Sequence, residues 1–290
     1  MPYPDELRRE VEHYLEGLRF SDEEEVTGGL GEAMRYSLLA GGKRIRPVLA
    51  LATARGLGRD TRELLPLAAA IELIHTYSLI HDDLPAMDDD DLRRGRPTCH
   101  VAFGEDVAIL AGDGLYAEAF RHVLTHQVGE PARILEAVGE LAAATGVNGM
   151  VGGQYLDVDR AAPAGAPGLR RLHELKTGRL IGASVECVLL IAGMSGPATN
   201  SYRGFAAELG VLFQIVDDIL DVTGTDDALG KPRGSDERHG KRTYVSEFGL
   251  DGARELAATS HDKARTALAE ADPAGPELEQ ITDFIYTRPS

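Results

Sequence analysis

The feature that most constrains the fold of this chain is the placement of clustered carboxylates beside long apolar helical patterns. The segment HDDLPAMDDDDLRRGRP, residues 81–97, has six aspartates within ten residues, and three arginines follow them directly. The mostly apolar run before it predicts a buried helix that ends near Asp83, because Pro85 disfavours helical geometry at Leu84. Two carboxylates at the end of a helix face the negative end of its dipole and repel each other. The pattern therefore predicts that a positive group binds there.

A second acidic segment, FQIVDDILD, repeats this chemistry. Gln214, Asp217, Asp218 and Asp221 recur at spacings of three and four, so they share one face of an otherwise apolar helix. Buried carboxylates need cationic partners or metal ions. Two oxygen-rich clusters facing one cavity suit Mg²⁺, which completes its coordination with substrate phosphates. With the nearby arginines and lysines, the two clusters predict a diphosphate site. The alternative for the first segment is a solvated acidic loop, which the second cluster disfavours.

Length, charge and cysteine content narrow the class of protein. The 290 residues are many for one domain but can form a single large helical core. The formal charge of -17 argues against nucleic acid and anionic membranes as partners. Two cysteines are too few for a disulfide framework, and the N-terminal residues lack the pattern of a secretory signal. We expect a cytoplasmic protein without membrane insertion, because charges and glycines interrupt its apolar helices.

Helical periodicity dominates the chain, and no stretch shows the sustained alternation of a strand. The sequence therefore predicts an all-α protein whose residues 1–290 form one helical-bundle domain. Two Gly/Pro-rich segments, 160–168 and 223–243, are long enough to act as flaps. The expected helices cover about 5–19, 31–40, 47–56, 61–83, 105–127, 131–151, 168–193, 199–222, 247–271 and 276–287.

The acidic segments and several shorter motifs resemble the trans-prenyl diphosphate synthases, and they are most similar to the bacterial farnesyl diphosphate synthases. The resemblance runs from about Gly31 to near the C-terminus, and the order and spacing of its motifs make it specific. It implies an isoprenoid-synthase bundle with a central cavity. The motifs are GGKRIRP (41–47), GDGL (112–115), GGQYLDV (152–158), KTG (176–178) and LGK (229–231), besides the two aspartate-rich segments.

The resemblance also implies two diphosphate sites. Taken alone, the three cations of GGKRIRP fit a solvated basic turn equally well, and a lone histidine such as His75 is more often a core residue. His75 lies two helical turns before Asp82, so the two share a face. By resemblance, the isopentenyl diphosphate site comprises Gly42, Lys43, Arg46, His75 and Arg94. The allylic diphosphate site comprises Arg93, Lys176, Lys231 and Lys241, with Thr177 and Gln214 beside the reacting carbons.

Metal ions are expected at both aspartate clusters. By resemblance, Asp82, Asp83 and Asp88 hold two Mg²⁺ ions, and Asp217, with Asp218 and Asp221, holds a third; Mn²⁺ is expected to substitute. An allylic diphosphate leaves as an anion, so cations at its oxygens stabilise the transition state. Lys176, Thr177, Gln214 and Asp217 are the expected catalytic residues. Thr177, Gln214 and the carbonyl of Lys176 are expected to stabilise the carbocation.

Product length depends on the floor of the cavity. Tyr77 lies five residues before Asp82, roughly 7.5 Å lower along a helix, and Ser78 beside it is too small to block a chain. An ordinary core tyrosine is the alternative. In the resembling family, a bulky aromatic here and a four-residue spacer between the aspartates accompany a fifteen-carbon product. Farnesyl diphosphate is therefore the first expectation, followed by geranylgeranyl and then geranyl diphosphate.

The partners expected are small diphosphates and, mainly by resemblance, a second copy of the chain. The run from Val107 to Phe120 adds more apolar helix than one core needs. Three other functions are possible: a non-catalytic regulatory subunit, a Ca²⁺-binding module and a head-to-head coupling enzyme. The intact aspartates and arginines disfavour the first, and the missing EF-hand spacing disfavours the second. Lys43, Arg46 and His75 disfavour the third, which needs no isopentenyl site.

Overall fold

The computed structural model describes residues 3–20, 26–159, 165–224, 241–271 and 274–288. Helices make up nearly all of the described regular structure, which confirms the predicted all-α class. The elements are α1 (Asp5–Gly17), α2 (Gly28–Leu38), α3 (Ile45–Gly56), η1 (Thr61–Leu64), α4 (Leu65–Asp82), β1 (Leu92–Arg93), β2 (Arg96–Pro97), α5 (Cys99–Phe103), α6 (Glu105–His126), α7 (Pro131–Thr145), α8 (Met150–Val158), α9 (Gly165–His173), η2 (Glu174–Gly178), α10 (Arg179–Ala192), α11 (Pro197–Thr223), α14 (Tyr244–Glu270) and α15 (Pro276–Thr287).

Helix α4 is the centre of the core. Leu67, Ile71 and Ile74 are fully buried on it, and Pro66 stands in its first turn, where a missing N–H is tolerated. The helix ends at Asp82, as the following Leu-Pro pair predicts. The segment Thr61–Asp82 has the length and hydropathy of a membrane span, but 67% of its most apolar window is buried inside the protein. It is a core helix in this fold.

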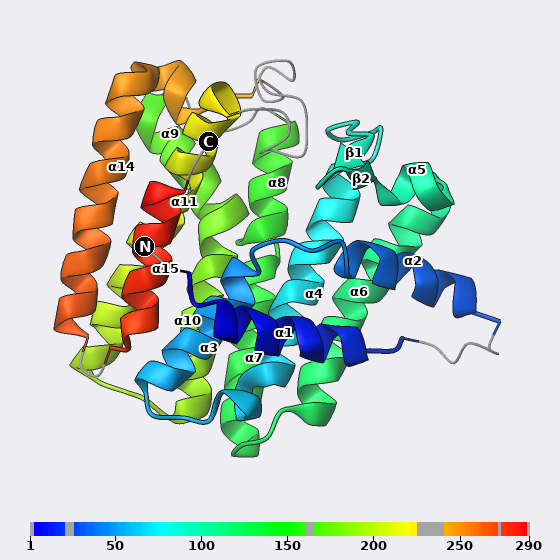
Figure 1. Ribbon diagram of the computed structural model, residues 1–290, viewed down its shortest axis with the longest axis horizontal. Helices are drawn as coiled ribbons and strands as arrows, with labels where there is room; N and C mark the ends of the chain where they lie inside the picture. Colours follow the sequence, from blue (N-terminus) through cyan, green and yellow to red (C-terminus); the bar gives the residue numbers. More distant parts are fainter. Residues whose placement is uncertain (1–2, 21–25, 160–164, 225–240, 272–273, 289–290) are drawn as a thin grey trace.

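The other helices pack around α4 in two directions (Figure 1). Helices α1 and α2 run across α4, α6 and α7, whereas α14 and α15 stand at the edge opposite α5. The ring of Tyr3, just before α1, contacts the ring of Phe284 in α15, with centroids 4.7 Å apart. Helices α4, α8 and α11 all run toward the end of the molecule that holds the β1–β2 hairpin. The two aspartate clusters therefore lie at the same end.

One predicted helix, residues 131–151, is wrong, because the structure divides it into α7 and α8. The backbone leaves the helix at Gly146, which has φ -79° and ψ -156°. A Cβ atom on Gly149 would lie 2.0 Å from the carbonyl oxygen of Ala144, so only glycine fits there. The break starts a new helix, α8, whose side chains line the cavity described below.

The predicted helix 168–193 contains a π-helical turn, η2, between α9 and α10. Glycines on two neighbouring helices allow close packing against this turn. A Cβ on Gly153 of α8 would meet the backbone nitrogen of Lys176 at 2.2 Å, and one on Gly210 of α11 would meet the Cα of Gly178 at 2.9 Å. Such π-turns occur mostly at functional sites. This one carries the KTG motif.

The β1–β2 hairpin was not predicted, because two-residue strands are too short to show alternation. Arg94 and Gly95 form its turn, with φ of 54° and 72°, the positive values that a two-residue hairpin turn requires. The turn separates the two adjacent arginines: Arg93 donates hydrogen bonds to Asp83, and Arg94 donates one to the carbonyl of Gly41. The two adjacent arginines therefore point to different sides.

Candidate active site

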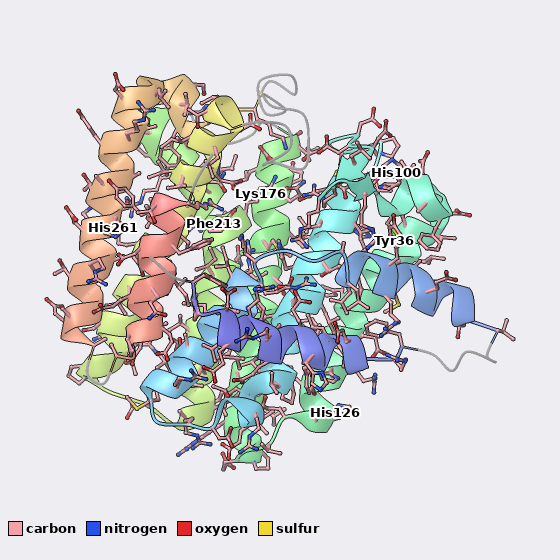
Figure 2. All side chains as sticks on the ribbon, in the orientation of Figure 1. Tyr36, His100, His126, Lys176, Phe213 and His261 are labelled. Carbon is pink, nitrogen blue, oxygen red and sulfur yellow. The ribbon has the colours of Figure 1, made fainter. Side chains whose placement is uncertain are left out.

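A cavity of about 700 Å³ lies between α4, α8, η2, α11 and the hairpin, a volume typical of ligand sites. Figure 2 shows Lys176 and Phe213, two of its lining residues, near the middle of the molecule, whereas Tyr36, His126 and His261 lie toward the edges. Most of the predicted site residues line this cavity: Arg46, His75, Tyr77, Ser78, Asp82, Asp88, Arg93, Arg94, Lys176, Thr177, Gln214, Asp217, Asp218, Asp221 and Lys241.

Carboxylates from both clusters line the cavity, and the helices that carry them, α4 and α11, run toward the same end of the molecule. Burial raises the pKa of Asp82, and the positive charge of Lys176 offsets this only in part. Asp88 accepts a hydrogen bond of 2.7 Å from the ammonium of Lys241. Across the cavity, Asp217 lies 3.4 Å from the guanidinium of Arg288, just beyond α15. A cation bound beside Asp82 would therefore stabilise the charged form of its carboxylate.

Asp83 is not brought together with the other predicted metal ligands. Its side chain is buried and forms a bidentate ion pair with Arg93, with contacts of 2.8 and 2.9 Å to Nε. Burial raises the pKa of Asp83, and the bonds from Arg93 oppose that rise. Asp83 is absent from the cavity lining, whereas Arg93 is part of it. In this geometry the aspartate holds the arginine rather than facing the cavity.

Asp218 belongs to a hydrogen-bond chain that joins three elements. The Thr177 hydroxyl donates to the Gln214 side-chain oxygen at 3.0 Å, and the Gln214 amide donates to Asp218 Oδ1 at 2.7 Å. Asp218 Oδ2 accepts the backbone N–H of Tyr244 at 2.7 Å. Oδ1 of this buried residue therefore fixes Gln214, and through it Thr177, whereas Oδ2 holds the start of α14 against α11. These two residues were predicted together, and the structure places them in contact.

The acidic end suits Mg²⁺. In the part of the chain that the structure describes, no group of three or more carboxylate, imidazole or thiolate side chains is placed to enclose an ion. Mg²⁺ is ordinarily held by one or two carboxylates, with waters and substrate phosphates as the other ligands. Asp82 and Asp88 on one wall and Asp217 and Asp221 on the other would serve in that way. A divalent ion there would neutralise carboxylates and bind diphosphate oxygens.

The other end of the cavity is cationic. Arg46 is nine-tenths buried, and its Nη1 lies 3.3 Å from His75 Nε2. Burial lowers the pKa of Arg46 to about 10. Burial, and then the charge of Arg46, lowers the pKa of His75 well below its usual value. Arg94 completes this corner, and the close approach of its guanidinium leaves no room for a Cβ on Gly42. A buried group of cations of this kind attracts an anion.

Two of the predicted binding residues that the structure describes, Gly42 and Lys43, do not line the cavity. Gly42 supports Arg94 instead. Lys43 is exposed, with its ammonium 5.4 Å from the centroid of the Phe284 ring. Lys231, with the LGK motif and most of both predicted flaps, lies outside the described residues.

Lys176 is held at the acidic end by a residue that the site prediction missed. Its ammonium donates a 2.6 Å hydrogen bond to Asp157 of α8. Burial alone would lower the pKa of Lys176, but Asp82 and Asp157 outweigh burial and raise it, so the ammonium stays charged. Asp157 stands in GGQYLDV, a motif of the resemblance that received no role. The motif was the signal that could have pointed to Asp157 and to its neighbour Gln154.

Tyr77 lines the cavity below Asp82. Its ring contacts the rings of His81 and Tyr116 edge-on, with centroids 5.2 and 5.0 Å away. Burial raises the pKa of Tyr77 to about 12, so its hydroxyl stays neutral. The hydroxyl of Ser78 bonds back to the carbonyl of His75 at 2.9 Å. A bulky ring therefore stands one and a half helical turns from Asp82, with a small residue beside it.

Comparison with known proteins decides the family. Residues 28–275 match the family described as polyprenyl synthetase. The chain belongs to this family. It is 45% identical over 273 residues to farnesyl diphosphate synthase of Geobacillus stearothermophilus, covering 93% of this chain and 92% of that protein. It is 48% identical over 262 residues to the chloroplastic geranylgeranyl pyrophosphate synthase of Catharanthus roseus, covering 89% of this chain and 73% of that one.

A solved structure of another prenyl-transferring protein has the same fold. The geranyltransferase of Helicobacter pylori, complexed with magnesium and isoprenyl diphosphate, superimposes with a TM-score of 0.86 at 32% identity. The match covers 98% of this chain and 97% of that one. The predicted family, isoprenoid-synthase fold and prenyltransferase class of this polyprenyl synthetase family member are confirmed.

Proposed function

We propose that this protein condenses isopentenyl diphosphate head to tail with an allylic diphosphate, dimethylallyl or geranyl, in a Mg²⁺-dependent reaction that gives farnesyl diphosphate and diphosphate. The observation that carries this proposal is that two groups of opposite charge line one cavity. One end has carboxylates from α4 and α11, which suit a metal-bridged diphosphate. The other has Arg46, His75 and Arg94, which suit a diphosphate bound without metal.

The allylic diphosphate binds at the acidic end. Mg²⁺ there supplies charge stabilisation for the leaving oxygens, and we expect about three ions, which Mn²⁺ can replace. Asp82, Asp88, Asp217 and Asp221 supply oxygen ligands. Lys176, Lys241 and Arg93 meet the negative charge that grows as the carbon–oxygen bond breaks. Asp83 keeps Arg93 in place, and Lys231 is proposed to join this group by resemblance.

Isopentenyl diphosphate binds at the cationic end. Arg46 and Arg94 offer planar sets of donors to its phosphates, and His75 adds a hydrogen bond. Lys43 and Gly42 are proposed to join them by resemblance, with Gly42 giving room for Arg94. The two diphosphates thus anchor two prenyl groups with their reactive carbons toward the middle of one dry cavity.

The reaction then needs three changes of bonding. The allylic carbon–oxygen bond breaks, and diphosphate leaves with the electron pair. The isopentenyl double bond attacks the allylic carbon and forms the new carbon–carbon bond. A proton leaves the adjacent carbon, and the released diphosphate accepts it. The Thr177 hydroxyl oxygen, the Gln214 oxygen and the Lys176 carbonyl in the π-turn direct partial negative charge at the cation.

Tyr77 supports a fifteen-carbon product, because its ring would meet the end of a growing chain. Geranylgeranyl diphosphate is the second candidate, because a geranylgeranyl pyrophosphate synthase is among the similar proteins. Incubation with labelled isopentenyl diphosphate, geranyl diphosphate and Mg²⁺, followed by chromatography of the products, tests the proposal. The proposal expects one fifteen-carbon product and none in excess chelator. A twenty-carbon product would identify the protein as a geranylgeranyl diphosphate synthase instead. The absence of any product would support the regulatory-subunit alternative.

The protein is further proposed to act as a cytoplasmic homodimer. Large apolar side chains are exposed on three successive helices, and such surfaces usually mark interfaces. The net charge of -17 favours solubility of the dimer. Sedimentation of the wild type at micromolar concentration should show a dimer, and Leu110→Glu should weaken it; a monomeric wild type would contradict the proposal. The exposed residues are Val101 of α5, Ile109, Leu110 and Leu124 of α6, and Leu135 of α7.

A further inference from the structure

Two buried polar side chains in the cavity wall have no role in the site described so far. Neither nitrogen of His173 and neither amide atom of Gln154 has a hydrogen-bond partner among the described residues. Both side chains line the cavity. His173 is only 7% exposed, so bulk water does not replace the missing partner. Native proteins rarely leave such groups unsatisfied, so each one calls for an explanation.

The surroundings of His173 distinguish it from an ordinary core histidine. It is the last residue of α9 and stands one turn before Lys176, on the same face. Its ring stacks on Tyr244, with centroids 5.4 Å apart and an angle of 24° between the planes. This stacking fixes the ring but satisfies neither nitrogen. By contrast, His122, which is similarly buried on α6, lies 2.9 Å from the Tyr14 hydroxyl.

Charge around His173 selects the kind of ligand. Burial lowers the pKa of His173 to about 4, with Asp157 opposing and Lys176 and Arg242 adding to the effect. The imidazole is therefore neutral near pH 7 and offers one N–H donor and one acceptor. One carboxylate, Asp157, and two cations, Lys176 and Arg242, act on it, and Asp157 already accepts a hydrogen bond from Lys176. An anionic oxygen bound between these cations is the favoured partner for the donor. Mg²⁺ prefers oxygen ligands, so direct metal ligation by this nitrogen is disfavoured.

We propose that His173 donates a hydrogen bond to the diphosphate of the allylic substrate, beside the ammonium of Lys176. This assignment rests on the proposed function, because that function puts an allylic diphosphate at Lys176. The isopentenyl site is built from α3, α4 and the hairpin, whereas His173 stands on α9. His173 therefore serves one of the two diphosphates and not the other. As a neutral donor it orients the leaving group without adding to the net charge that the metal and Lys176 supply.

The matched test pair is His173→Phe and His122→Phe. The first keeps a flat ring against Tyr244 but removes both nitrogens, and the second removes a buried neutral histidine away from the cavity. The probe is a non-reactive allylic thiolodiphosphate with Mg²⁺, measured by calorimetry. His173→Phe should weaken probe binding about 10- to 100-fold, the range for one hydrogen bond to a charged group. Its KM for isopentenyl diphosphate should change less than twofold, and His122→Phe should match the wild type in both.

A second variant and an NMR measurement on the wild type test the same hydrogen bond. His173→Gln retains an N–H donor and should recover much of the probe affinity that His173→Phe loses. In the wild type, nitrogen NMR of the histidine rings should show a shift of the His173 signal when the probe binds, whether or not the variants fold. Unchanged affinity of a folded His173→Phe variant for the probe would overturn the assignment. So would a His173 nitrogen signal that does not shift when the probe binds. If the wild type neither binds the probe nor condenses substrates, the proposed function fails instead.

Discussion

Burial and partners, rather than residue type, separate the roles of the cations in this site. Arg44 and Arg46 stand two residues apart in one motif. Arg44 adopts φ 53°, is 3% exposed, and bonds Glu72 at 2.7 Å and the carbonyl of Leu38 at 2.7 Å. It locks the start of α3 to α4 with a buried ion pair. Arg46 is held beside His75 instead, which leaves its charge available to an anion in the cavity.

The two ends of the cavity should separate kinetically. Arg46→Gln should raise the KM for isopentenyl diphosphate about 10- to 100-fold with little change in kcat, because that diphosphate stays bound to its carbon throughout the reaction. Lys176→Gln should lower kcat by a similar factor, because Lys176 meets charge that appears only as the allylic bond breaks. Steady-state kinetics with both substrates varied will check this. The reverse pattern would mean that the two ends are assigned the wrong way round.

The length of the prenyl product should depend on the aromatic ring of Tyr77. Tyr77→Ala removes the bulk below Asp82 and should shift the products from fifteen carbons to twenty or more. Tyr77→Phe retains the ring and should keep the fifteen-carbon product, which separates bulk from the hydroxyl group. Chromatography of labelled products gives the readout. A fifteen-carbon product from Tyr77→Ala would remove Tyr77 from the account.

At the scale of elements, tight helix contacts place the catalytic turn. The π-turn η2 carries Lys176 and Thr177 and is packed against Gly153 of α8 and Gly210 of α11. Because the close atoms are backbone atoms, a side chain at either glycine cannot be accommodated by a change of rotamer. The geometry of the turn thus depends on residues that touch no substrate.

Gly153→Ala tests this dependence. Its Cβ would lie 2.2 Å from the Lys176 nitrogen, so α8 or the turn must shift. We expect a loss of about 1–3 kcal/mol in the free energy of unfolding, the usual cost of overpacking, and a larger fall in kcat than in substrate affinity. Gly182→Ala in α10 is the control, because its Cβ would meet nothing within 4 Å. It should be neutral or slightly stabilising. Equal behaviour of the two variants in urea unfolding and kinetics would contradict the packing argument.

Long periodic patterns in the sequence predicted the helices that carry the site. The sequence did not predict short elements or the pairing of particular side chains. The apolar periodicity of residues 61–82 and 199–222 predicted α4 and α11, and the predicted metal ligands other than Asp83 line the cavity. Periodicity alone could not show that Gly146 would divide α7 from α8. Nor could it show that Asp83 would pair with Arg93, because that pairing depends on a hairpin of two-residue strands. His173 escaped because an unpartnered nitrogen is visible only once its neighbours are placed.

At the scale of the whole molecule, buried neutral histidines link stability to pH. Burial, and then the charge of His126, lowers the pKa of His122 to about 4 from its usual 6.5. Between these values the unfolded chain binds a proton that the folded chain does not. The contribution of His122 to the free energy of unfolding is therefore greatest above pH 6.5 and falls as the pH drops toward 4. His173 adds to the same trend, because its pKa is also lowered to about 4 by burial.

The linkage predicts a measurable slope. In urea unfolding at pH values from 7 to 4.5, His122 should lower the free energy of unfolding by about 1–3 kcal/mol as the pH falls. The difference in unfolding free energy between the wild type and His122→Phe should therefore change by that amount between pH 7 and pH 4.5, whatever the stability of the variant at pH 7. Parallel curves for the variant and the wild type would show that His122 does not carry the proton linkage.

The central claim is that one cavity holds two diphosphates, one through metal and one without it. Equilibrium binding to the wild type tests this most directly, with labelled isopentenyl diphosphate alone and with a non-reactive allylic thiolodiphosphate alone, each in Mg²⁺ and in chelator. The account predicts that isopentenyl diphosphate binds equally in both conditions and is lost in Arg46→Gln. It predicts that the allylic probe binds only with Mg²⁺ and is lost in Asp82→Asn. Metal-dependent binding of isopentenyl diphosphate together with metal-independent binding of the allylic probe would contradict it.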